Sequence, residues 1–335
     1  MTSAFVRCAV IGGGAWGTAI ADRLVRNGHA VTLWAREHDV VATINEQHEN
    51  PRFLAGARLS PLLRASADIH EALENALLVV YAAPSHVLRT VVASGHSAVH
   101  RDAVLAVATK GIERETLALM TDVVAQELPG HAVAAISGPS FAAEVAADEP
   151  TAVVAACTSR AGAAFVQRSL SASHLRVYTS DDVVGVELGG ALKNVMAVAT
   201  GILDGLGLGY NPRAALMTRG LAEMTRLGVA LGARAETFAG LAGLGDLVLT
   251  CTGALSRNRA VGVAIGQGRT LEHALAGKDS VAEGVLNAQS ARALADRVGV
   301  EMPIIDAVHR ILFAGQPPRE AIADLMAREL RAERD

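Results

Sequence analysis

The hydrophobic and polar positions of the chain follow two different patterns that meet near residue 180. Before that point, apolar runs of strand length alternate with segments whose apolar residues recur every three or four positions, as in helices. After it, the strand-like runs disappear and helical spacing continues almost to the C-terminus. We therefore predict an α/β domain over residues 1–180, with a mainly parallel, doubly wound sheet of the Rossmann type, and an all-α domain over residues 181–335.

The same pattern predicts the individual elements. Expected strands cover residues 6–11, 30–35, 76–82, 103–108, 132–136, 151–156 and 175–178, and expected helices cover residues 15–27, 38–48, 67–73, 84–95 and 115–127. In the second domain we expect a helix over 187–197, a flexible loop over 240–246 and a helix over 260–265. The residues from 328 to 335 alternate in charge and are expected to be a solvated helix end.

A glycine-rich turn joins the first expected strand to the first expected helix. Gly12, Gly14 and Gly17 have the spacing G-x-G-x-x-G. The first glycine permits a sharp turn, the second lets a pyrophosphate approach the backbone, and the third lets helix and strand pack closely. The free N–H groups of the helix N-terminus favour a phosphate there. This stretch predicts a dinucleotide site.

Two charged residues follow the second expected strand, where such a unit meets the adenosine ribose. An arginine at this place accommodates a 2′-phosphate, whereas an acidic residue favours a free 2′-hydroxyl. Arg36 comes first after the strand and Glu37 follows it. We predict a preference for NADP(H), with NAD(H) as the alternative. If the two residues have no role in binding, they form a solvated ion pair at the end of the strand.

Composition and charge narrow the class of protein. The net charge of −4 gives no reason to expect a nucleic-acid partner. Apolar runs end well before the roughly 18 residues of a membrane span, so we expect no membrane insertion. Cys8, Cys157 and Cys251 are too scattered for a disulfide framework, which predicts a cytoplasmic protein. His96 and His100 have no evident third ligand, so no metal is expected.

Polar residues follow two further expected strands of the first domain. Lys110 comes directly after the strand over 103–108, and Gly138 and Ser140 come after the strand over 132–136. Ligands of open α/β sheets bind along the carboxyl edge of the strands. Lys110 is therefore a candidate for a ligand near the cofactor, with a surface lysine as the alternative. The turn at Gly138 offers N–H groups and a hydroxyl, although by itself it is only a turn.

Lys193 is the strongest candidate in the second domain. It shares a helix face with Gly189 and Gly190, and two glycines inside a helix cost about 1 kcal/mol each relative to alanine. This indicates that something approaches the helix closely there. A lysine desolvated on an apolar helix has a lowered pKa, in the range useful for proton transfer. The alternative is a lysine that extends to solvent beside a close helix contact.

Residues 246 and 256–258 carry the remaining candidates. Asp246 ends a glycine-rich stretch, where its carboxylate is expected to orient Lys193, to accept a substrate hydroxyl or to cap the next helix. Ser256 is a good N-cap, and Arg257 and Asn258 follow it. A helix N-terminus with such side chains suits a phosphate or a carboxylate.

These segments, taken in order, resemble one family, the bacterial NAD(P)-dependent glycerol-3-phosphate dehydrogenases. The resemblance covers nearly the whole chain and rests on the stretches IGGGAWG (11–17), ATKGIE (108–113), SGPSFA (137–142), ELGGALKN (187–194), GLGDL (243–247) and SRN (256–258). It implies reversible reduction of dihydroxyacetone phosphate to sn-glycerol 3-phosphate, the entry to glycerophospholipid synthesis. It also implies an all-helical second domain and a homodimer.

The resemblance further assigns roles to individual residues. Lys193 is implied to be the proton donor in reduction and the acceptor in oxidation. The substrate is implied to contact Lys110, Gly138, Ser140, Lys193, Asp246, Ser256, Arg257 and Asn258. The cofactor is implied to contact the glycine turn and Ala15, Trp16, Arg36, Phe53, Lys110, Ala142, Arg257, Val281 and Glu283. The chain departs from the family at Ala15, where serine is frequent, and at Ala282, where a larger apolar residue is usual; the aromatic Phe53 has simple packing as its alternative role.

Two other functions compete with this one. A β-hydroxyacid or sugar-acid dehydrogenase also joins a Rossmann half to a helical half, and it would place a carboxylate rather than a phosphate at Arg257. A non-catalytic NAD(P)-sensing protein would make Lys193 purely structural.

Overall fold

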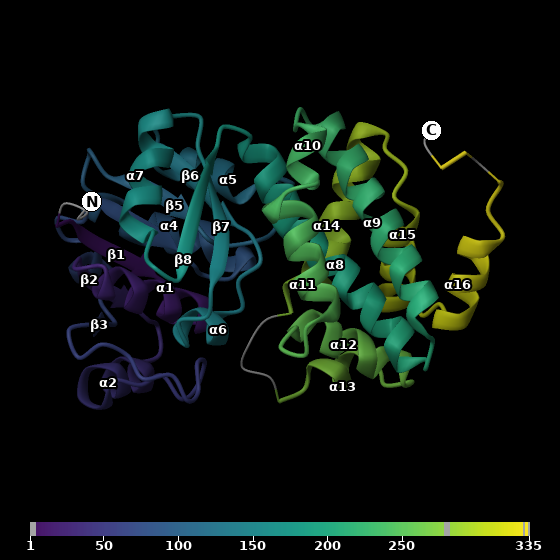
Figure 1. Ribbon diagram of the computed structural model, residues 1–335, viewed down its shortest axis with the longest axis horizontal. Coiled ribbons are helices and arrows are strands. Elements are labelled where there is room, and N and C mark those ends of the chain that lie inside the picture. The colour runs from purple at the N-terminus through teal and green to yellow at the C-terminus, as the bar shows by residue number, and fades with distance from the viewer. Residues whose placement is uncertain (1–4, 278–281, 331, 334–335) are drawn as a thin grey trace.

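The computed structural model describes residues 5–277, 282–330 and 332–333. A sheet with its helices forms one end of the molecule and a group of helices forms the other, with the N-terminal part of the chain in the first and the C-terminal part in the second (Figure 1). The predicted combination of a Rossmann-type sheet and an all-helical part is confirmed.

Eight strands form one sheet in the order β3-β2-β1-β4-β5-β6-β7-β8. Their bounds are β1 Arg7–Ile11, β2 Ala30–Trp34, β3 Arg64–Ser66, β4 Leu78–Tyr81, β5 Val104–Val107, β6 Ala132–Ser137, β7 Thr151–Ala156 and β8 Leu175–Ser180. Among the strands in the described residues, only β6 and β7 pair antiparallel, so the sheet is mainly parallel, as predicted. The strand β3 was missed because its three residues, RAS, form no apolar run.

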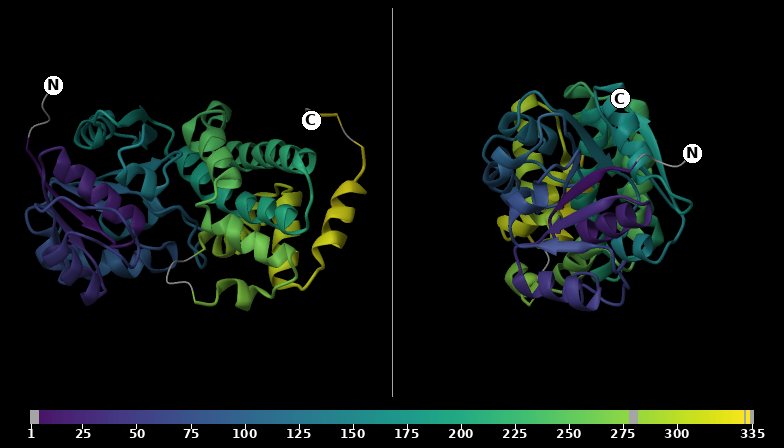
Figure 2. Two further views of the ribbon diagram at one scale, coloured as in Figure 1. Left: turned by 60° about the horizontal axis from the view of Figure 1, so that its bottom comes forward. Right: turned by 90° about the vertical axis from the view of Figure 1, so that its left-hand side faces the viewer.

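Helices cover both faces of this sheet (Figure 2). They are α1 Ala15–Arg26, α2 His38–Gln47, α3 Ile69–Leu73, η1 Ser85–Val87, α4 Leu88–Gly95, η2 His96–Ala98, α5 Met120–Glu127, α6 Ala142–Ala146 and α7 Arg160–Leu170. Successive residues of a strand point to opposite faces. Val10 and Val80 accordingly belong to one core, and Ala9 and Val79 to the other.

The predicted helix over 115–127 is wrong in its first turn. The chain forms a loop there, closed by a bridge between Ile112 and Leu119, and α5 begins only at Met120. Leu117 has a φ of 59°, which a right-handed helix does not allow. Polar contacts of Glu113 with Arg89 hold the loop in place of helical hydrogen bonds.

The helical part begins at α8, which runs through its centre. Its elements are α8 Val183–Gly205, α9 Tyr210–Ala230, α10 Ala235–Phe238, η3 Leu241–Gly245, α11 Asp246–Thr252, α12 Arg257–Gly266, α13 Leu271–Leu275, α14 Glu283–Val298, α15 Pro303–Phe313 and α16 Pro318–Met326. The helix α8 has the length and hydropathy of a membrane span, but 89% of that window is buried in the protein. Its apolar residues pack against neighbouring helices.

Two expectations for this part are wrong. The segment over 240–246 is not a flexible loop but a π-helical turn that leads directly into α11. The described residues from Arg328 to Leu330 are exposed and lie beyond α16, which ends at Met326, so they are not a helix end. Arg328 and Glu329 are charged and Leu330 is fully exposed, so a helical turn there would bury no apolar face and gain no packing energy.

Main-chain contact joins α8 to α12. A Cβ atom on Gly201 would lie 2.1 Å from the carbonyl oxygen of Arg259, and one on Gly205 would lie 2.3 Å from that of Val263. Gly262 faces α8 in the same way. No side chain larger than hydrogen fits at these positions, so the two helices touch backbone to backbone.

Candidate active site

The glycine turn between β1 and α1 has the geometry that its sequence predicts. Gly12 has a φ of 131°, and a Cβ atom there would lie 2.7 Å from the carbonyl carbon of Ala82. A Cβ atom on Gly17 would lie 1.9 Å from the oxygen of Gly12, which explains the close packing of helix on strand. Gly14 is the N-cap of α1, and no atom of the described residues lies within 4 Å of its Cβ position. The turn thus leaves the N-terminus of α1 open to a phosphate.

The loop after α2 is tied to this turn. The Asn50 side chain donates to the carbonyl oxygen of Gly13 at 2.9 Å and to the hydroxyl of Thr18 at 2.8 Å. Its oxygen accepts from the backbone N–H of Phe53 at 3.2 Å. Trp16, in the first turn of α1, has a buried indole N–H with no hydrogen-bond partner among the described residues. The turn, this unpaired donor and the open helix end fit a dinucleotide.

Three of the other expected cofactor contacts, Ala15, Arg36 and Ala142, follow the carboxyl ends of β1, β2 and β6. Ala15 and Ala142 are the first residues of α1 and α6, and both are half-buried against the core of the sheet. Arg36 is 82% exposed in its side chain and pairs with Glu37, which is 19% exposed, at 3.0 Å. The expected contact at Val281 lies outside the described residues.

Three charged side chains from distant parts of the sequence meet at the carboxyl edge of the sheet. Lys110, three residues after β5, places its Nζ 2.6 Å from Oδ2 of Asp246, the first residue of α11. Lys193, in the middle of α8, places its Nζ 2.5 Å from Oδ1 of the same carboxylate. Asp246 is fully buried, and the side chains of Lys110 and Lys193 are 16% and 9% exposed. Of the roles considered for Asp246, the geometry supports orientation of Lys193; its side chain does not cap α11.

The glycines before Lys193 explain how these elements come together. A Cβ atom on Gly189 would lie 2.3 Å from the carbonyl oxygen of Ala242 in η3. One on Gly190 would lie 2.6 Å from the Ser137 hydroxyl and 3.4 Å from the Lys110 side chain. Because neither glycine has a side chain, the turn that carries Asp246 and the aliphatic part of the Lys110 side chain can both pack directly against α8.

The electrostatics of the cluster favour proton exchange at Lys193. Burial lowers its pKa to about 8, with a further contribution from the ammonium of Lys110, although the carboxylate of Asp246 opposes the shift. Burial disfavours ionisation of Asp246, but the two ammonium groups outweigh it and hold the pKa of that carboxyl below its usual range. Lys193 is thus poised near neutral pH beside a permanent anion.

The predicted turn after β6 joins this cluster. The carbonyl oxygen of Gly138 accepts from Nζ of Lys110 at 3.3 Å and from the hydroxyl of Ser140 at 3.0 Å. Just before it, the hydroxyl of Ser137 is buried and has no partner in the described part of the chain. Polar groups therefore face one another from the sheet edge and from α8.

The residues at the start of α12 lie next to α8. Ser256 caps α12 by accepting from the N–H of Arg259 at 3.2 Å, as its sequence position predicts. Asn258 donates to the side-chain oxygen of Asn194 at 2.9 Å and accepts from the N–H of Gly284 at 2.9 Å. Arg257 is exposed, and none of the hydrogen bonds found in the described ranges uses its guanidinium.

Three polar residues that the sequence analysis did not single out complete the arrangement. Thr250 accepts from Nζ of Lys193 at 2.8 Å, and its position four residues after Asp246 on one helix was the available signal. Asn287 accepts from the N–H of Ile112 at 3.4 Å and donates to the carbonyl oxygen of Ala191 at 3.1 Å. Ser85 donates its N–H and its hydroxyl to Glu283, at 3.0 and 2.5 Å.

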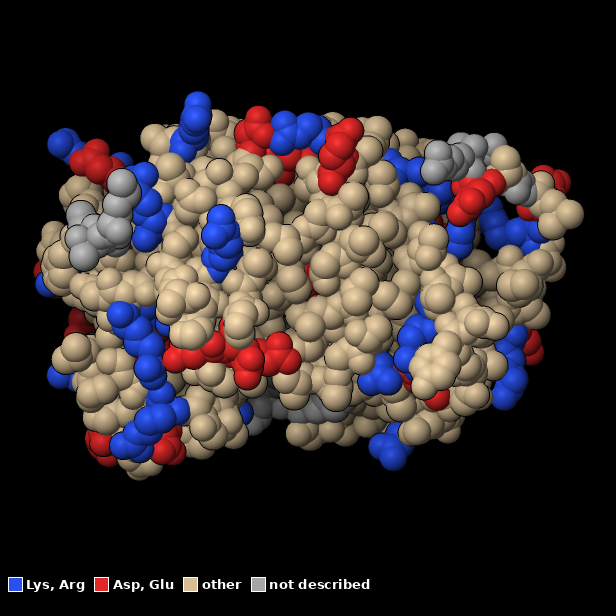
Figure 3. Space-filling model, in the orientation of Figure 1, with Lys and Arg blue, Asp and Glu red and all other residues tan. Residues whose placement is uncertain are grey.

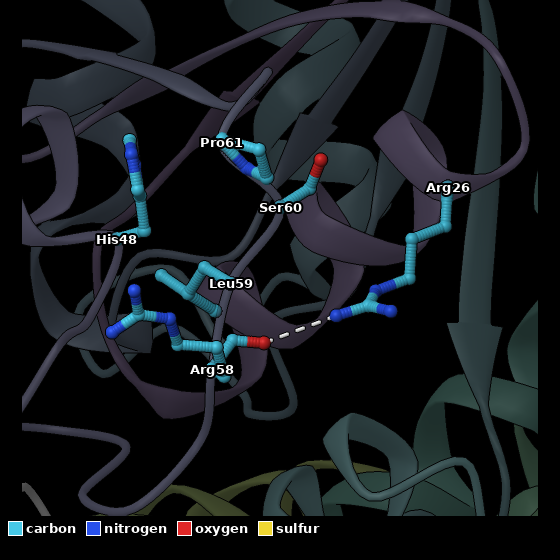
Figure 4. A pocket seen from close by; sticks show the side chains of 6 residues that line it. All are labelled: Arg26, His48, Arg58, Leu59, Ser60 and Pro61. Carbon is cyan, nitrogen blue, oxygen red and sulfur yellow. Dashed lines mark hydrogen bonds between the residues drawn. The ribbon is translucent and has the colours of Figure 1, made fainter.

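A separate cavity of about 430 Å³ lies elsewhere in the N-terminal part. It is lined by Arg26, His48, Arg58, Leu59, Ser60 and Pro61, and Arg26 donates to the carbonyl oxygen of Arg58 across it at 3.0 Å (Figure 4). Arg26 ends α1, about 18 Å along that helix from the glycine turn. The cavity is thus not part of the Lys110–Asp246–Lys193 site.

The charges on the visible face are mixed rather than segregated. In Figure 3, basic and acidic side chains lie together near the upper edge and at both ends, and a row of acidic side chains lies below and to the left of the centre of this face. With a net charge of −4, an anionic ligand depends on local cations such as those of the site.

The protein combines a Rossmann sheet, which has an open turn for a phosphate, with a helical part that supplies a buried lysine. This combination places it in the class of two-part nicotinamide-dependent oxidoreductases. Models of the N-terminus and the C-terminus of NAD-dependent glycerol-3-phosphate dehydrogenase match residues 7–163 and 182–323. The chain belongs to this family.

Individual relatives agree over almost the full length. The chain is 52% identical over 330 residues to glycerol-3-phosphate dehydrogenase (NAD(P)+) of Geobacter sp. strain M21, covering 98% of both chains. It is 53% identical to that of Syntrophotalea carbinolica, covering 97% of this chain and 99% of the relative. The crystal structure of glycerol-3-phosphate dehydrogenase from Coxiella burnetii superposes with a TM-score of 0.93 at 41% identity, covering 97% of this chain and 99% of that one.

Proposed function

We propose that this protein catalyses the reversible, NAD(P)H-dependent reduction of dihydroxyacetone phosphate to sn-glycerol 3-phosphate and so feeds glycerophospholipid synthesis. The observation that carries the proposal is the buried Lys110–Asp246–Lys193 cluster, which joins the edge of the dinucleotide-binding sheet to α8. Family membership narrows the substrate to the pair for which the family is named.

The chain's residues divide the work of the reaction. The nicotinamide, when bound, supplies a hydride to the carbonyl carbon. The ammonium of Lys193 stabilises the negative charge that develops on the carbonyl oxygen and then gives it a proton from Nζ. Asp246 and Thr250 hold Nζ in place, and Lys110 adds a second positive charge on the side of the sheet. In oxidation the neutral amine of Lys193 takes the proton back.

We assign the phosphate of the substrate to the start of α12. Its N-terminal N–H groups and the uncommitted guanidinium of Arg257 suit a dianion, and Asn258 is fixed beside them by Asn194. Binding energy from this remote group orients the reacting carbon. Dihydroxyacetone, which lacks the phosphate, is therefore expected to lose turnover as well as affinity, and equal turnover at saturation would contradict this assignment.

The cofactor preference, the cellular setting, the oligomeric state and the domain boundary are the remaining assignments. Arg36, two residues after β2, supports NADP(H) over NAD(H), and three buried cysteines without disulfide bonds support a cytoplasmic setting. We also propose a homodimer and a domain boundary at residue 180, where β8 ends before α8 begins.

The test compares NADPH oxidation with dihydroxyacetone phosphate in the unaltered protein, in Lys193→Ala and in Lys193→Arg. A general acid predicts a loss of about 10² or more in kcat for both variants, because arginine keeps the charge but does not release a proton near neutral pH. Full activity of Lys193→Arg would reduce the role of Lys193 to its charge. An inactive unaltered protein that still binds NADPH would overturn the proposed substrate and favour a hydroxyacid dehydrogenase or a sensor.

A further inference from the structure

A buried carboxylate outside the catalytic cluster connects the two parts of the molecule. Glu187, on α8, accepts from the backbone N–H of Thr121 at 2.9 Å and from the Thr121 hydroxyl. Thr121 is the second residue of α5, and the N-cap of that helix, Leu119, has no side chain that can accept a hydrogen bond. Glu187 therefore satisfies an N-terminal N–H group of α5 from a different helix.

A second buried glutamate also binds the N-terminus of another helix, but it lies entirely within the helical part. Glu223, on α9, accepts from the N–H groups of Ile304 and Ile305 at the start of α15, and so caps one helix of the helical part with another. Glu187 instead reaches from the helical part to a helix that covers the sheet. Both carboxyl groups are buried, with 7% and 3% of the residue exposed.

The position of Glu187 along α8 relates it to the reaction. It precedes Lys193 by six residues, which is about 9 Å along the helix. A short loop joins α5 to β6, which ends at Ser137, and Gly138, whose carbonyl oxygen binds Lys110, follows it directly. The contact with Thr121 thus links the helix that carries Lys193 to the strand that ends at the site.

We propose that Glu187 is a positioning residue for the reaction: by binding the N-terminus of α5, it fixes α8, and hence Lys193, relative to the edge of the sheet where the nicotinamide binds. The inference rests on the proposed role of Lys193. Because the cofactor site lies on the sheet and the proton donor lies on α8, their alignment depends on contacts between the two parts. A misplacement of about 1 Å reduces a rate by up to about 10².

The chemistry of the position supports this role. Burial raises the pKa of Glu187 to about 7, although its hydrogen bonds to Thr121 oppose the shift. A carboxyl group at such a place is less favourable than a well-packed apolar side chain. Its hydrogen bonds to α5 provide what an apolar residue does not, which is a directional contact.

The experiment compares Glu187→Ala and Thr121→Val with the matched control Glu223→Ala, in which another buried helix-capping carboxyl is lost away from the sheet. For each variant we would measure kcat with saturating dihydroxyacetone phosphate and NADPH, the kinetic isotope effect with deuterated NADPH, the Kd for NADPH and the thermal midpoint. Amide hydrogen exchange at Thr121 and Ile304, without substrate or cofactor, reports whether each contact is lost.

The expected result separates alignment from stability. Glu187→Ala and Thr121→Val should lose about tenfold in kcat and show a larger isotope effect, with the Kd for NADPH changed less than twofold. Thr121→Ser, which keeps the hydroxyl, should restore kcat. Glu223→Ala should be destabilised like Glu187→Ala but keep kcat within twofold.

Other results would overturn the inference. An equal fall in kcat for Glu223→Ala would mean that both carboxyl groups act only through stability. An unchanged kcat in Glu187→Ala would also overturn the inference. If Glu187→Ala does not fold, an unchanged kcat in Thr121→Val would overturn it instead. Inactivity of the unaltered protein would overturn the proposed function and this inference with it, whereas the preceding results overturn only the inference.

Discussion

Replacement of Asp246 by asparagine tests the electrostatics of the site with almost no change in shape. The carboxylate lies 2.5 Å from Nζ of Lys193 and 2.6 Å from Nζ of Lys110. Asparagine removes its negative charge and leaves two ammonium groups facing each other in a buried place. The effects that lower the pKa of Lys193, burial and the charge of Lys110, are then no longer opposed.

The size of the effect follows from Coulomb's law. Two unit charges about 4 Å apart interact by about 4 kcal/mol at an effective dielectric constant of about 20, and one pKa unit corresponds to about 1.4 kcal/mol. Because the carboxylate charge is spread over two oxygens, its mean distance from Nζ is longer than the 2.5 Å contact, and on this scale its loss lowers the pKa of Lys193 by about three units. The carboxylate is shared with Lys110, which weakens its effect on Lys193. We therefore expect the pKa of Lys193 to fall by roughly one to three units from its starting value of about 8.

The assay is the pH dependence of kcat for reduction of dihydroxyacetone phosphate by NADPH. With Lys193 as the proposed proton donor, reduction requires its protonated form, so kcat should fall as the pH rises through about 8 in the unaltered protein and at least one unit lower in Asp246→Asn. Asp182→Asn, which alters the buried N-cap of α8 away from the lysines, controls for destabilisation. A midpoint in Asp246→Asn that stays in place or moves upward would refute this reasoning.

Three further changes test other parts of the structure. Gly262→Ala would bring a Cβ atom within 2.1 Å of the carbonyl oxygen of Val198, so denaturant unfolding should show a loss of about 1–3 kcal/mol or more; full stability would contradict the backbone contact. Arg36→Ala should raise the KM for NADPH at least tenfold and leave that for NADH nearly unchanged, and equal effects in steady-state kinetics would reject the 2′-phosphate contact. Burial raises the pKa of Glu223 to about 7, so the folded state binds a proton more tightly than the unfolded state. The protonated carboxyl therefore contributes stability on the order of 3 kcal/mol, which is lost as the pH rises from about 4.5 through 7. Glu223→Gln should flatten that part of the stability profile in urea titrations, and an unchanged slope would count against the assignment.

Local patterns predicted most of the fold because the strands are short apolar runs and the glycine turn follows β1 directly. The failures have physical causes. The three residues of β3 form no apolar run, so only pairing with β2 makes them a strand. The glycine-rich stretch before Asp246 has low helix propensity, yet it is helical because Gly189 lets it pack against the backbone of α8. Propensity scales contain no information about such a tertiary contact.

The candidate site was predictable in its residue types but not in its contacts. Only three of the 30 basic residues of the chain are lysines, and two of them, Lys110 and Lys193, share one carboxylate. That scarcity was a signal in the sequence that the motif analysis did not use. The partners Thr250 and Glu187 were missed because a threonine or glutamate on a helix is usually exposed and unremarked. Which of them point inward depends on how α8, α11 and α5 pack.

The backbone contact between α8 and α12 has a consequence for substrate length. Lys193 lies on α8 and Arg257 begins α12, so the proposed proton donor and the proposed phosphate ligand belong to two helices whose main chains touch at Gly201 and Gly262. Main-chain dimensions do not vary with rotamers or with nearby substitutions. For a substrate held between the two helices as proposed, the distance between their backbones is therefore fixed, and substitution of the surrounding side chains changes the contacts of the substrate without changing that distance.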